Sequence, residues 1–258
     1  YQLHSNDGWK PDFSDIAEKM DDSVRLLVLI NPNNPCGTVC GADDIDALLE
    51  IARRYPNCIV VADEIYDGLD FTGEHVSVAS RSDDVPVVAL NGVSKVYYAP
   101  GWRIGYMALH DPTNRMGLVR DGLERLLRSR LCASTPAQVG YLAGLEQDRG
   151  WMETYSERVL RRRDHCLKRI AQIDGLEVEQ PGGAFYMFVR LTDERWANDD
   201  KAFVLQLLHE EHVLLVHGSG FSPQLGKGHV RLVYLLTLEV LDEVFDRIER
   251  FLKKHRGH

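Results

Sequence analysis

Three apolar segments of the chain each run into polar residues that could take part in catalysis. Asn34 stands in the motif NPNNPCG, Asp63 begins DEIYDG, and Lys95 ends NGVSK. A lysine amine can form a Schiff base with an aldehyde cofactor, and an aspartate can keep a pyridine nitrogen protonated so that the ring accepts electrons. Asn34 and Tyr66 can donate hydrogen bonds to a phenolate oxygen beside such an imine. Arg103, eight residues after Lys95, offers a planar fork that suits a phosphate.

The elements that must position these residues follow from the apolar pattern. Val24–Ile30 and Ile59–Ala62 are nearly continuous apolar runs, which is typical of strands that are buried on both faces. Asp43–Tyr55 lies between them and has apolar residues on one helical face. This spacing predicts a βαβ unit with parallel strands. Val85–Leu90 and Arg103–Leu109 are predicted as two further strands of the same sheet.

The predicted strands bring three of the candidate residues together. In open parallel sheets, ligands bind beyond the carboxyl ends of the strands. Asn34, Asp63 and Lys95 each follow such an end, so we expect them to converge at one edge of the sheet.

The apolar pattern of the rest of the chain indicates a second, smaller α/β domain. A helix over Asn114–Arg130 belongs to the first part, and a long helix over Gly150–Ile173 leads from it to the second. The remaining predicted elements are strands at Phe185–Leu191, Val213–His217 and Val230–Leu235, and helices at Lys201–His212 and Glu239–Lys254. We therefore expect a large domain over residues 1–160 that ends in an interdomain helix, and a small domain over residues 161–258.

Six motifs in a fixed order carry a resemblance to a known family. They are NPNNPCG, DEIYDG, SK followed by Arg after seven residues, PGWRIGY, PGGAFYMF and GHVRLVYL. In this order they resemble the class I/II aminotransferases that depend on pyridoxal 5′-phosphate (PLP), from about Gly8 to the last helix. The resemblance implies an α/β architecture of the PLP-transferase fold type I, with a mostly parallel sheet flanked by helices.

The resemblance also implies roles for residues around the cofactor ring. The motif lysine of the family carries the cofactor and later moves the proton, a role that falls on Lys95. The family's aspartate holds the pyridine nitrogen, which matches Asp63. Asn34 and Tyr66 match the two residues that contact the ring oxygen, and Asn34 is also expected to contact the substrate.

Two further positions match the family's anion-binding residues, and a third position departs from the pattern. Arg103 matches the arginine that binds the phosphate, and Arg231 matches the arginine that binds the substrate α-carboxylate. Gly92 stands where many relatives have a phosphate-binding serine, and Ser94 is the remaining hydroxyl next to the lysine. Ser94 is therefore included among the expected cofactor contacts.

The implied activity is the transfer of an amino group between an amino acid and a 2-oxo acid such as 2-oxoglutarate. NGVSK, PGWRIGY, HGSGF and GHVRLVYL look most like alanine aminotransferases of the bacterial and archaeal type. The family also implies a homodimer in which the partner subunit completes the active site. Two alternatives stay open, namely a non-catalytic effector domain of a transcription regulator and another PLP chemistry such as β-elimination. A helix-turn-helix sequence upstream would favour the regulator.

The N-terminal part of the family pattern does not occur in this sequence. In the family, that part supplies a glycine-rich turn that holds the phosphate and an aromatic ring stacked on the cofactor. We therefore expect an under-filled cofactor pocket and exposed apolar surface where such elements would pack.

The composition argues against several other classes of protein. The net charge of −9 over 258 residues argues against a nucleic-acid-binding protein. The five scattered cysteines do not form a disulfide framework, which favours a reducing compartment such as the cytoplasm. Neither the Cys36–Cys40 pair nor the His209–His212 pair has the spacing of a complete metal site, so no metal is expected. No apolar run reaches the roughly 18 residues of a membrane-spanning helix, so no membrane contact is expected.

Overall fold

A computed structural model of the chain describes residues 1–148 and 150–256, and these residues divide into two compact units. The first unit comprises Tyr1 and residues 12–32 and 39–153. The second comprises residues 2–11 and 33–38 and the chain from Thr154 onward. The first unit ends at Glu153, in the same long helix in which the boundary was predicted at residue 160. Two short early segments also group with the second unit, which the apolar pattern does not indicate.

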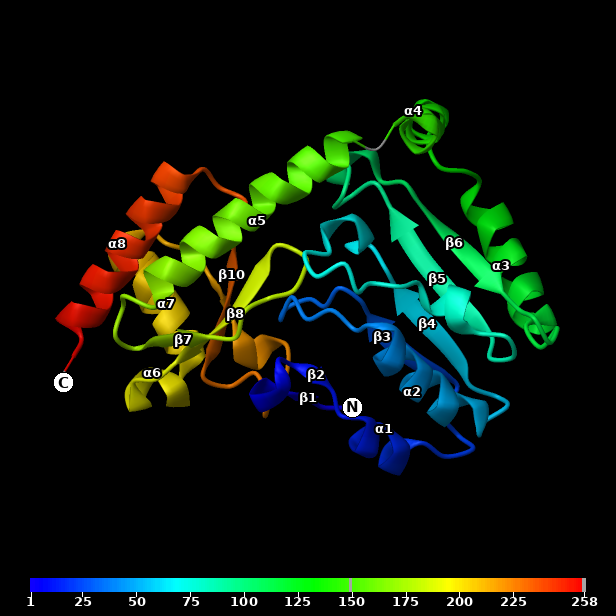
Figure 1. Ribbon diagram of the computed structural model, residues 1–258, viewed down its shortest axis with the longest axis horizontal. Coiled ribbons are helices and arrows are strands. Elements are labelled where there is room, and N and C mark those ends of the chain that lie inside the picture. The colour runs from blue at the N-terminus through cyan, green and yellow to red at the C-terminus, as the bar shows by residue number, and fades with distance from the viewer. Residues whose placement is uncertain (149, 257–258) are drawn as a thin grey trace. The chain divides into compact units, whose positions relative to one another are not determined.

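A four-stranded sheet forms the centre of the first unit. Its strands, in spatial order, are β3 (Leu26–Ile30), β4 (Ile59–Asp63), β5 (Val87–Gly92) and β6 (Gly105–His110). The first three strands are parallel and β6 is antiparallel to β5. The predicted mostly parallel sheet is therefore present, and Figure 1 shows the four strands side by side.

Helix α2 (Ala42–Arg53) connects β3 to β4 and completes the predicted βαβ unit. The Asp44 carboxylate accepts a hydrogen bond from the Gly41 N–H at 3.1 Å, which fixes the first turn of the helix. Ile45 and Leu48 on the apolar face are fully buried and belong to the same core cluster as residues of β3 and β4. The apolar face therefore covers the sheet, as the helical periodicity predicts.

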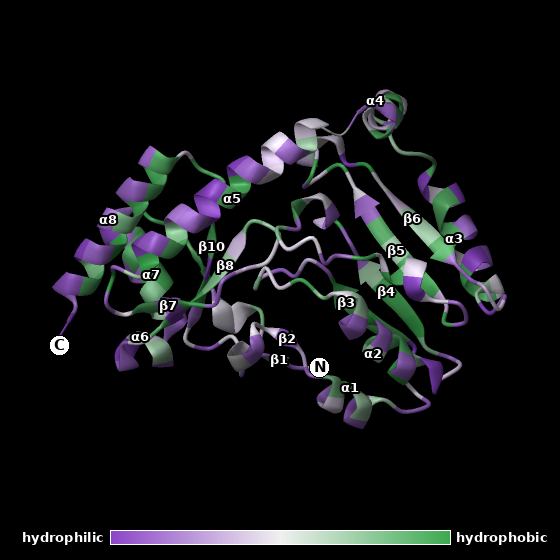
Figure 2. Cartoon of the chain, viewed as in Figure 1, coloured by the Kyte–Doolittle hydropathy of each residue, from purple (hydrophilic) through white to green (hydrophobic). Residues whose placement is uncertain are grey.

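Apolar side chains are exposed on the outer strands and on one helix of the first unit. The outer strands are β3, where Leu26 is 57% exposed, and β6, where Tyr106 is 47% exposed. The helix is α3 (Gly117–Arg130), in which no described residue is buried. Figure 2 shows α3 with hydrophobic and hydrophilic residues together, whereas β4 is mostly hydrophobic. Exposed apolar surface was predicted from the missing motifs, and the segment that would cover it stays a prediction.

Several elements of the first unit were not predicted from the pattern. Helix α1 spans Phe13–Lys19 and helix α4 spans Thr135–Glu146. The pattern also did not indicate a contact of Tyr1, whose hydroxyl donates to the carbonyl of Val28 on the outer strand β3 at 2.9 Å. A short 3₁₀ helix over Pro100–Trp102 also was not predicted, and β6 therefore begins two residues after Arg103 and not at it.

The second unit contains an antiparallel sheet covered by helices. The strands, in spatial order, are β7 (Leu176–Val178), β8 (Tyr186–Leu191), β10 (His229–Val233) and β9 (Val216–His217). The helices are α5 (Gly150–Ile170), which begins in the first unit, α6 (Glu194–Asn198), α7 (Asp200–Glu211) and α8 (Leu238–Lys254). A two-stranded hairpin, β1 (Leu3–His4) and β2 (Lys10–Pro11), also belongs to this unit. Trp196, Phe203 and Phe251 pack against one another in its core.

Within residues 1–148 and 150–256, no helix combines the length and the apolar character that crossing a membrane requires.

Candidate active site

Asp63 and Lys95 lie at the same edge of the first sheet. Asp63 is the last residue of β4 and pairs with Leu90 of β5, and Lys95 follows the end of β5 by three residues. The positive charge of Lys95 lowers the pKa of Asp63, which reflects their proximity. The predicted convergence of these two residues therefore follows from the parallel pairing of β4 and β5.

The Asp63 carboxyl occupies an environment that opposes its charge. Burial raises the pKa of Asp63 above its usual value, and this effect outweighs the Ile65 N–H and the charge of Lys95, which both lower it. The Ile65 N–H donates to Asp63 Oδ1 at 3.3 Å. A partly buried carboxylate of this kind is stabilised by a cationic partner such as a protonated ring nitrogen.

Tyr66 lies beside Lys95. The Tyr66 side chain is buried, and its ring centroid is 5.8 Å from Lys95 Nζ. Tyr66 follows β4 by three residues, so the loop after this strand provides both the acid and the phenol. The first unit thus gathers three of the predicted site residues, Asp63, Tyr66 and Lys95.

Arg103 is held in an unusual backbone conformation. It follows the 3₁₀ helix over Pro100–Trp102 and adopts the left-handed region, with φ 53° and ψ 42°. Its Nη1 donates to the Pro100 carbonyl at 2.6 Å, and the residue is exposed. Ser94 is partly buried between β5 and Lys95. The phosphate-binding roles of Arg103 and Ser94 stay predictions.

The second unit brings Asn34 and Arg231 together. Arg231 stands in the middle of β10, and its Nη1 donates to Asn34 Oδ1 at 2.8 Å. Asn34 is positioned by the turn around it, in which the Asn33 N–H donates to the Thr38 carbonyl at 2.8 Å. Arg231 Nε is buried and has no hydrogen-bond partner. A buried donor without a partner is costly, so it marks a place where an acceptor would be favoured.

Two aromatic residues beside Arg231 were not assigned a role from the sequence. The guanidinium carbon of Arg231 lies 4.6 Å from the ring centroid of Tyr186 and 5.0 Å from that of Phe221. Tyr186 lies in the PGGAFYMF motif and Phe221 in HGSGF, so both belong to recognised motifs. The motifs alone do not reveal which of their aromatic residues reach the arginine. That all the predicted site residues line a single pocket stays a prediction, because Asn34 and Arg231 belong to the second unit and the others to the first.

The Cys36–Cys40 pair, which was considered as a metal site from its spacing, lies in the interior of the protein. Cys36 and Cys40 are both buried, and burial strongly raises the pKa of the Cys36 thiol. A thiol that resists ionisation is a poor metal ligand. In the described part of the chain, no group of three or more His, Cys, Asp or Glu residues could hold a metal ion.

Comparison with known proteins places the chain among aminotransferases. The family model described as "Aminotransferase class I and II" matches residues 1–248. The chain is 35% identical to the glutamate-pyruvate aminotransferase AlaA of Haemophilus influenzae, covering 99% of this chain and 64% of that protein. It is 33% identical to the alanine aminotransferase of Mycobacterium tuberculosis, covering 99% of this chain and 60% of that protein. The chain therefore spans less than two thirds of the length of these curated relatives.

Solved structures give the same result for the fold. An alanine aminotransferase from Pyrococcus furiosus is 43% identical with a TM-score of 0.94, covering 99% of this chain and 64% of that chain. An aminotransferase from Escherichia coli is 33% identical with a TM-score of 0.92, with the same coverage. The predicted α/β fold of the PLP-transferase type is thus confirmed.

Proposed function

Because the chain belongs to class I and II of the aminotransferases, we propose that it provides the catalytic lysine and most of the active site for PLP-dependent transamination. The observation that carries this proposal is the grouping of Asp63, Tyr66 and Lys95 at the carboxyl ends of β4 and β5. An amine, an acid and a phenol at this edge form the set that an aldehyde cofactor with a pyridine ring requires.

The residues of this chain fit PLP chemically. The partly buried Asp63 carboxyl, whose pKa is raised by burial, suits a protonated ring nitrogen as its partner. The Lys95 amine suits the aldehyde, and the Arg103 guanidinium suits the phosphate. Tyr66 and the Asn34 amide nitrogen, whose neighbouring oxygen is occupied by Arg231, would donate to the ring oxygen.

When bound, PLP supplies an aldehyde for the substrate amine and a ring that accepts electrons from the substrate Cα. Lys95 Nζ would hold the cofactor until the substrate amine replaces it, and would then take the proton from the substrate Cα. Asp63 would keep the ring nitrogen protonated. Tyr66 and Asn34 would orient the ring through its oxygen.

Arg231 would bind the substrate carboxylate. Its Nε–H is buried and has no partner, so a carboxylate oxygen would satisfy a donor that otherwise reduces stability. Asn34 already engages Nη1, which leaves Nε and Nη2 as the pair for the two carboxylate oxygens. This arrangement would fix the Cα–H bond relative to Lys95.

We propose alanine as the amino acid and 2-oxoglutarate as the amino-group acceptor. The support is the similarity to glutamate-pyruvate and alanine aminotransferases. We further propose a homodimer, as the family resemblance implies. The odd number and wide scatter of the five cysteines support a reducing compartment such as the cytoplasm.

The experiment is a half-reaction cycle followed by absorbance. The protein, purified with PLP, should show a visible band that alanine bleaches and 2-oxoglutarate restores. Lys95→Ala should lose the cycle, because it removes the amine proposed to move the Cα proton. Lys201→Ala, at an exposed position on α7, is the matched control and should cycle as the wild type does.

Two results would contradict the proposal. A complete cycle in Lys95→Ala would show that another residue moves the proton. A wild-type band that no amino acid changes would show that the protein binds the cofactor without transamination.

A further inference from the structure

Three side chains contact the guanidinium group of Arg231 in the second unit. Tyr186 on β8 and Phe221 after β9 place their ring centroids 4.6 Å and 5.0 Å from the guanidinium carbon. The Asn34 side-chain oxygen accepts from Nη1 at 2.8 Å. One hydrogen bond and two ring contacts therefore act on a side chain that otherwise has many rotamers.

Aromatic faces hold a guanidinium without using its hydrogen-bond donors. The attraction comes from the ring quadrupole and leaves the N–H groups free for an acceptor in the plane. Arg231 Nε is buried and without a partner, so the held group keeps an unused donor on one edge. This is the edge that a carboxylate would meet with two parallel hydrogen bonds.

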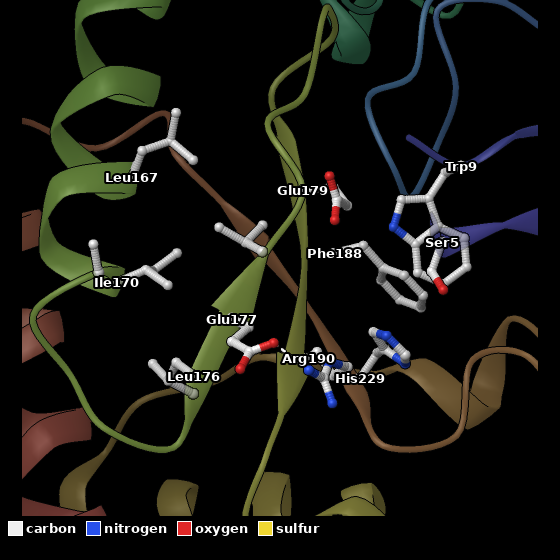
Figure 3. Close-up of a pocket in the computed structure, with 12 residues that line it drawn as sticks. Ser5, Trp9, Leu167, Ile170, Leu176, Glu177, Glu179, Phe188, Arg190 and His229 are labelled. Atoms are coloured by element: carbon white, nitrogen blue, oxygen red, sulfur yellow. Dashed lines mark hydrogen bonds and ion pairs between the residues drawn. The ribbon is translucent and has the colours of Figure 1, made fainter. Parts of the chain in front are cut away.

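Phe221 is itself held in place by a row of aromatic rings. Phe188 meets it edge to face, with centroids 6.0 Å apart and an interplanar angle of 87°. Phe188 in turn stacks on His229 at 4.9 Å and 9°, and Trp9 packs edge-on against both. Figure 3 shows Trp9, Phe188 and His229 grouped at the wall of a cavity of about 800 Å³. The hairpin that carries Trp9 thus packs against Phe188, which in turn contacts Phe221.

We propose that Phe221 and Tyr186 are positioning residues that present the Nε edge of Arg231 to the substrate carboxylate. This inference rests on the proposed carboxylate-binding role of Arg231. Phe221 is 39% exposed, so it contributes less to the core than Tyr186, which is buried. Phe221 is thus partly exposed, yet Phe188 fixes its orientation edge to face, so its ring acts on the arginine more than it fills the core.

The test measures carboxylate binding directly and needs neither cofactor nor turnover. The Nε–H signal of Arg231 is followed by NMR in arginine-labelled protein and assigned by its loss in Arg231→Gln. Pyruvate is the ligand, and pyruvamide, which lacks the carboxylate, is the comparison. Phe221→Leu should weaken pyruvate binding by roughly 3- to 30-fold, as expected for the loss of one cation–π contact, and should leave pyruvamide binding unchanged. Phe221→Tyr keeps a ring and should bind pyruvate as the wild type does.

A double-mutant cycle separates positioning from packing. For Phe221→Leu in the Arg231→Gln background, pyruvate binding is measured through the backbone amide signals. The second substitution should then cost nothing more, because there is no guanidinium left to position. Equal weakening in both backgrounds, equal weakening for pyruvate and pyruvamide, or no weakening at all would each overturn the inference. Tyr186→Leu repeats the cycle from the other ring.

The two proposals fail in different ways. If Arg231→Gln binds pyruvate as tightly as the wild type, Arg231 is not the carboxylate site, and the positioning role falls with it. If Arg231→Gln weakens pyruvate binding and Phe221→Leu does not, only the positioning role is wrong.

Discussion

Gly92 and Gly105 face each other across strands β5 and β6 with no room for a side chain between them. They are direct partners in the antiparallel register. A Cβ on Gly92 would lie 2.8 Å from Gly105 Cα and 2.8 Å from the Ile104 carbonyl oxygen. The serine that the family resemblance leads one to expect at this position therefore does not fit this backbone, so the departure has a steric reason.

Replacing Gly92 by Ser should lower the free energy of unfolding by about 1–3 kcal/mol, the usual cost of forcing atoms into a packed site. Urea denaturation measures the change. Gly122→Ala in α3 is the matched control, since a Cβ there meets no atom within 4 Å. It should raise the stability by about 0.5–1 kcal/mol, because alanine favours helix. A Gly92→Ser variant as stable as the wild type would show that the β5–β6 contact can open.

Asp63→Asn should stabilise the protein without cofactor at neutral pH. Burial raises the pKa of Asp63 in the folded state, so its stabilising contribution is present below the unfolded pKa of about 3.9 and is lost as pH rises through the folded pKa. The asparagine variant should therefore melt at a higher temperature than the wild type at pH 7. The difference should vanish below about pH 4. A lower melting temperature at pH 7 would mean that the attraction to Lys95 outweighs burial.

His229 should make the wild type sensitive to mild acid. Burial lowers the pKa of His229, so the unfolded chain takes up a proton near pH 6.5 while the folded chain does not. Its stabilising contribution is present above about pH 6.5 and is lost as pH falls toward the lower folded value. His229→Gln should flatten the fall in urea midpoint between about pH 6.5 and pH 5. His209→Gln, on the exposed surface of α7, should keep the wild-type slope.

Asn34→Ala should weaken the binding of the amino-acid substrate, because it removes a contact that holds Arg231. The substitution removes the acceptor of the 2.8 Å hydrogen bond from Nη1, and such bonds to charged groups contribute about 1.5–3 kcal/mol. Converted to a ratio of dissociation constants, this free energy corresponds to a rise in the KM for alanine of roughly 10- to 100-fold. Asn198→Ala, whose amide donates only to the Glu194 carbonyl on α6, should keep the wild-type KM. An unchanged KM in Asn34→Ala would show that Arg231 is held without this bond.

The strand ends could be predicted from the sequence because each is a local pattern. An apolar run followed by a polar residue identified the positions of Asp63 and Lys95, and parallel pairing brought them to one edge. The contacts of Phe221 with Arg231 could not be predicted, because antiparallel packing in the second unit joins residues of separate motifs. Helix α4 was missed although Pro136 occupies its first turn, since its apolar residues do not gather on one face.

The hydrogen bond from Tyr1 to Val28 has a consequence for how the protein meets other molecules. It places the first residue beside the outer strand β3, where Leu26 and Val28 are exposed. Unpaired strand edges readily add an extended peptide from another molecule. Tyr1→Phe would remove the partner of the Val28 carbonyl and should therefore leave this edge more open to pairing with another molecule.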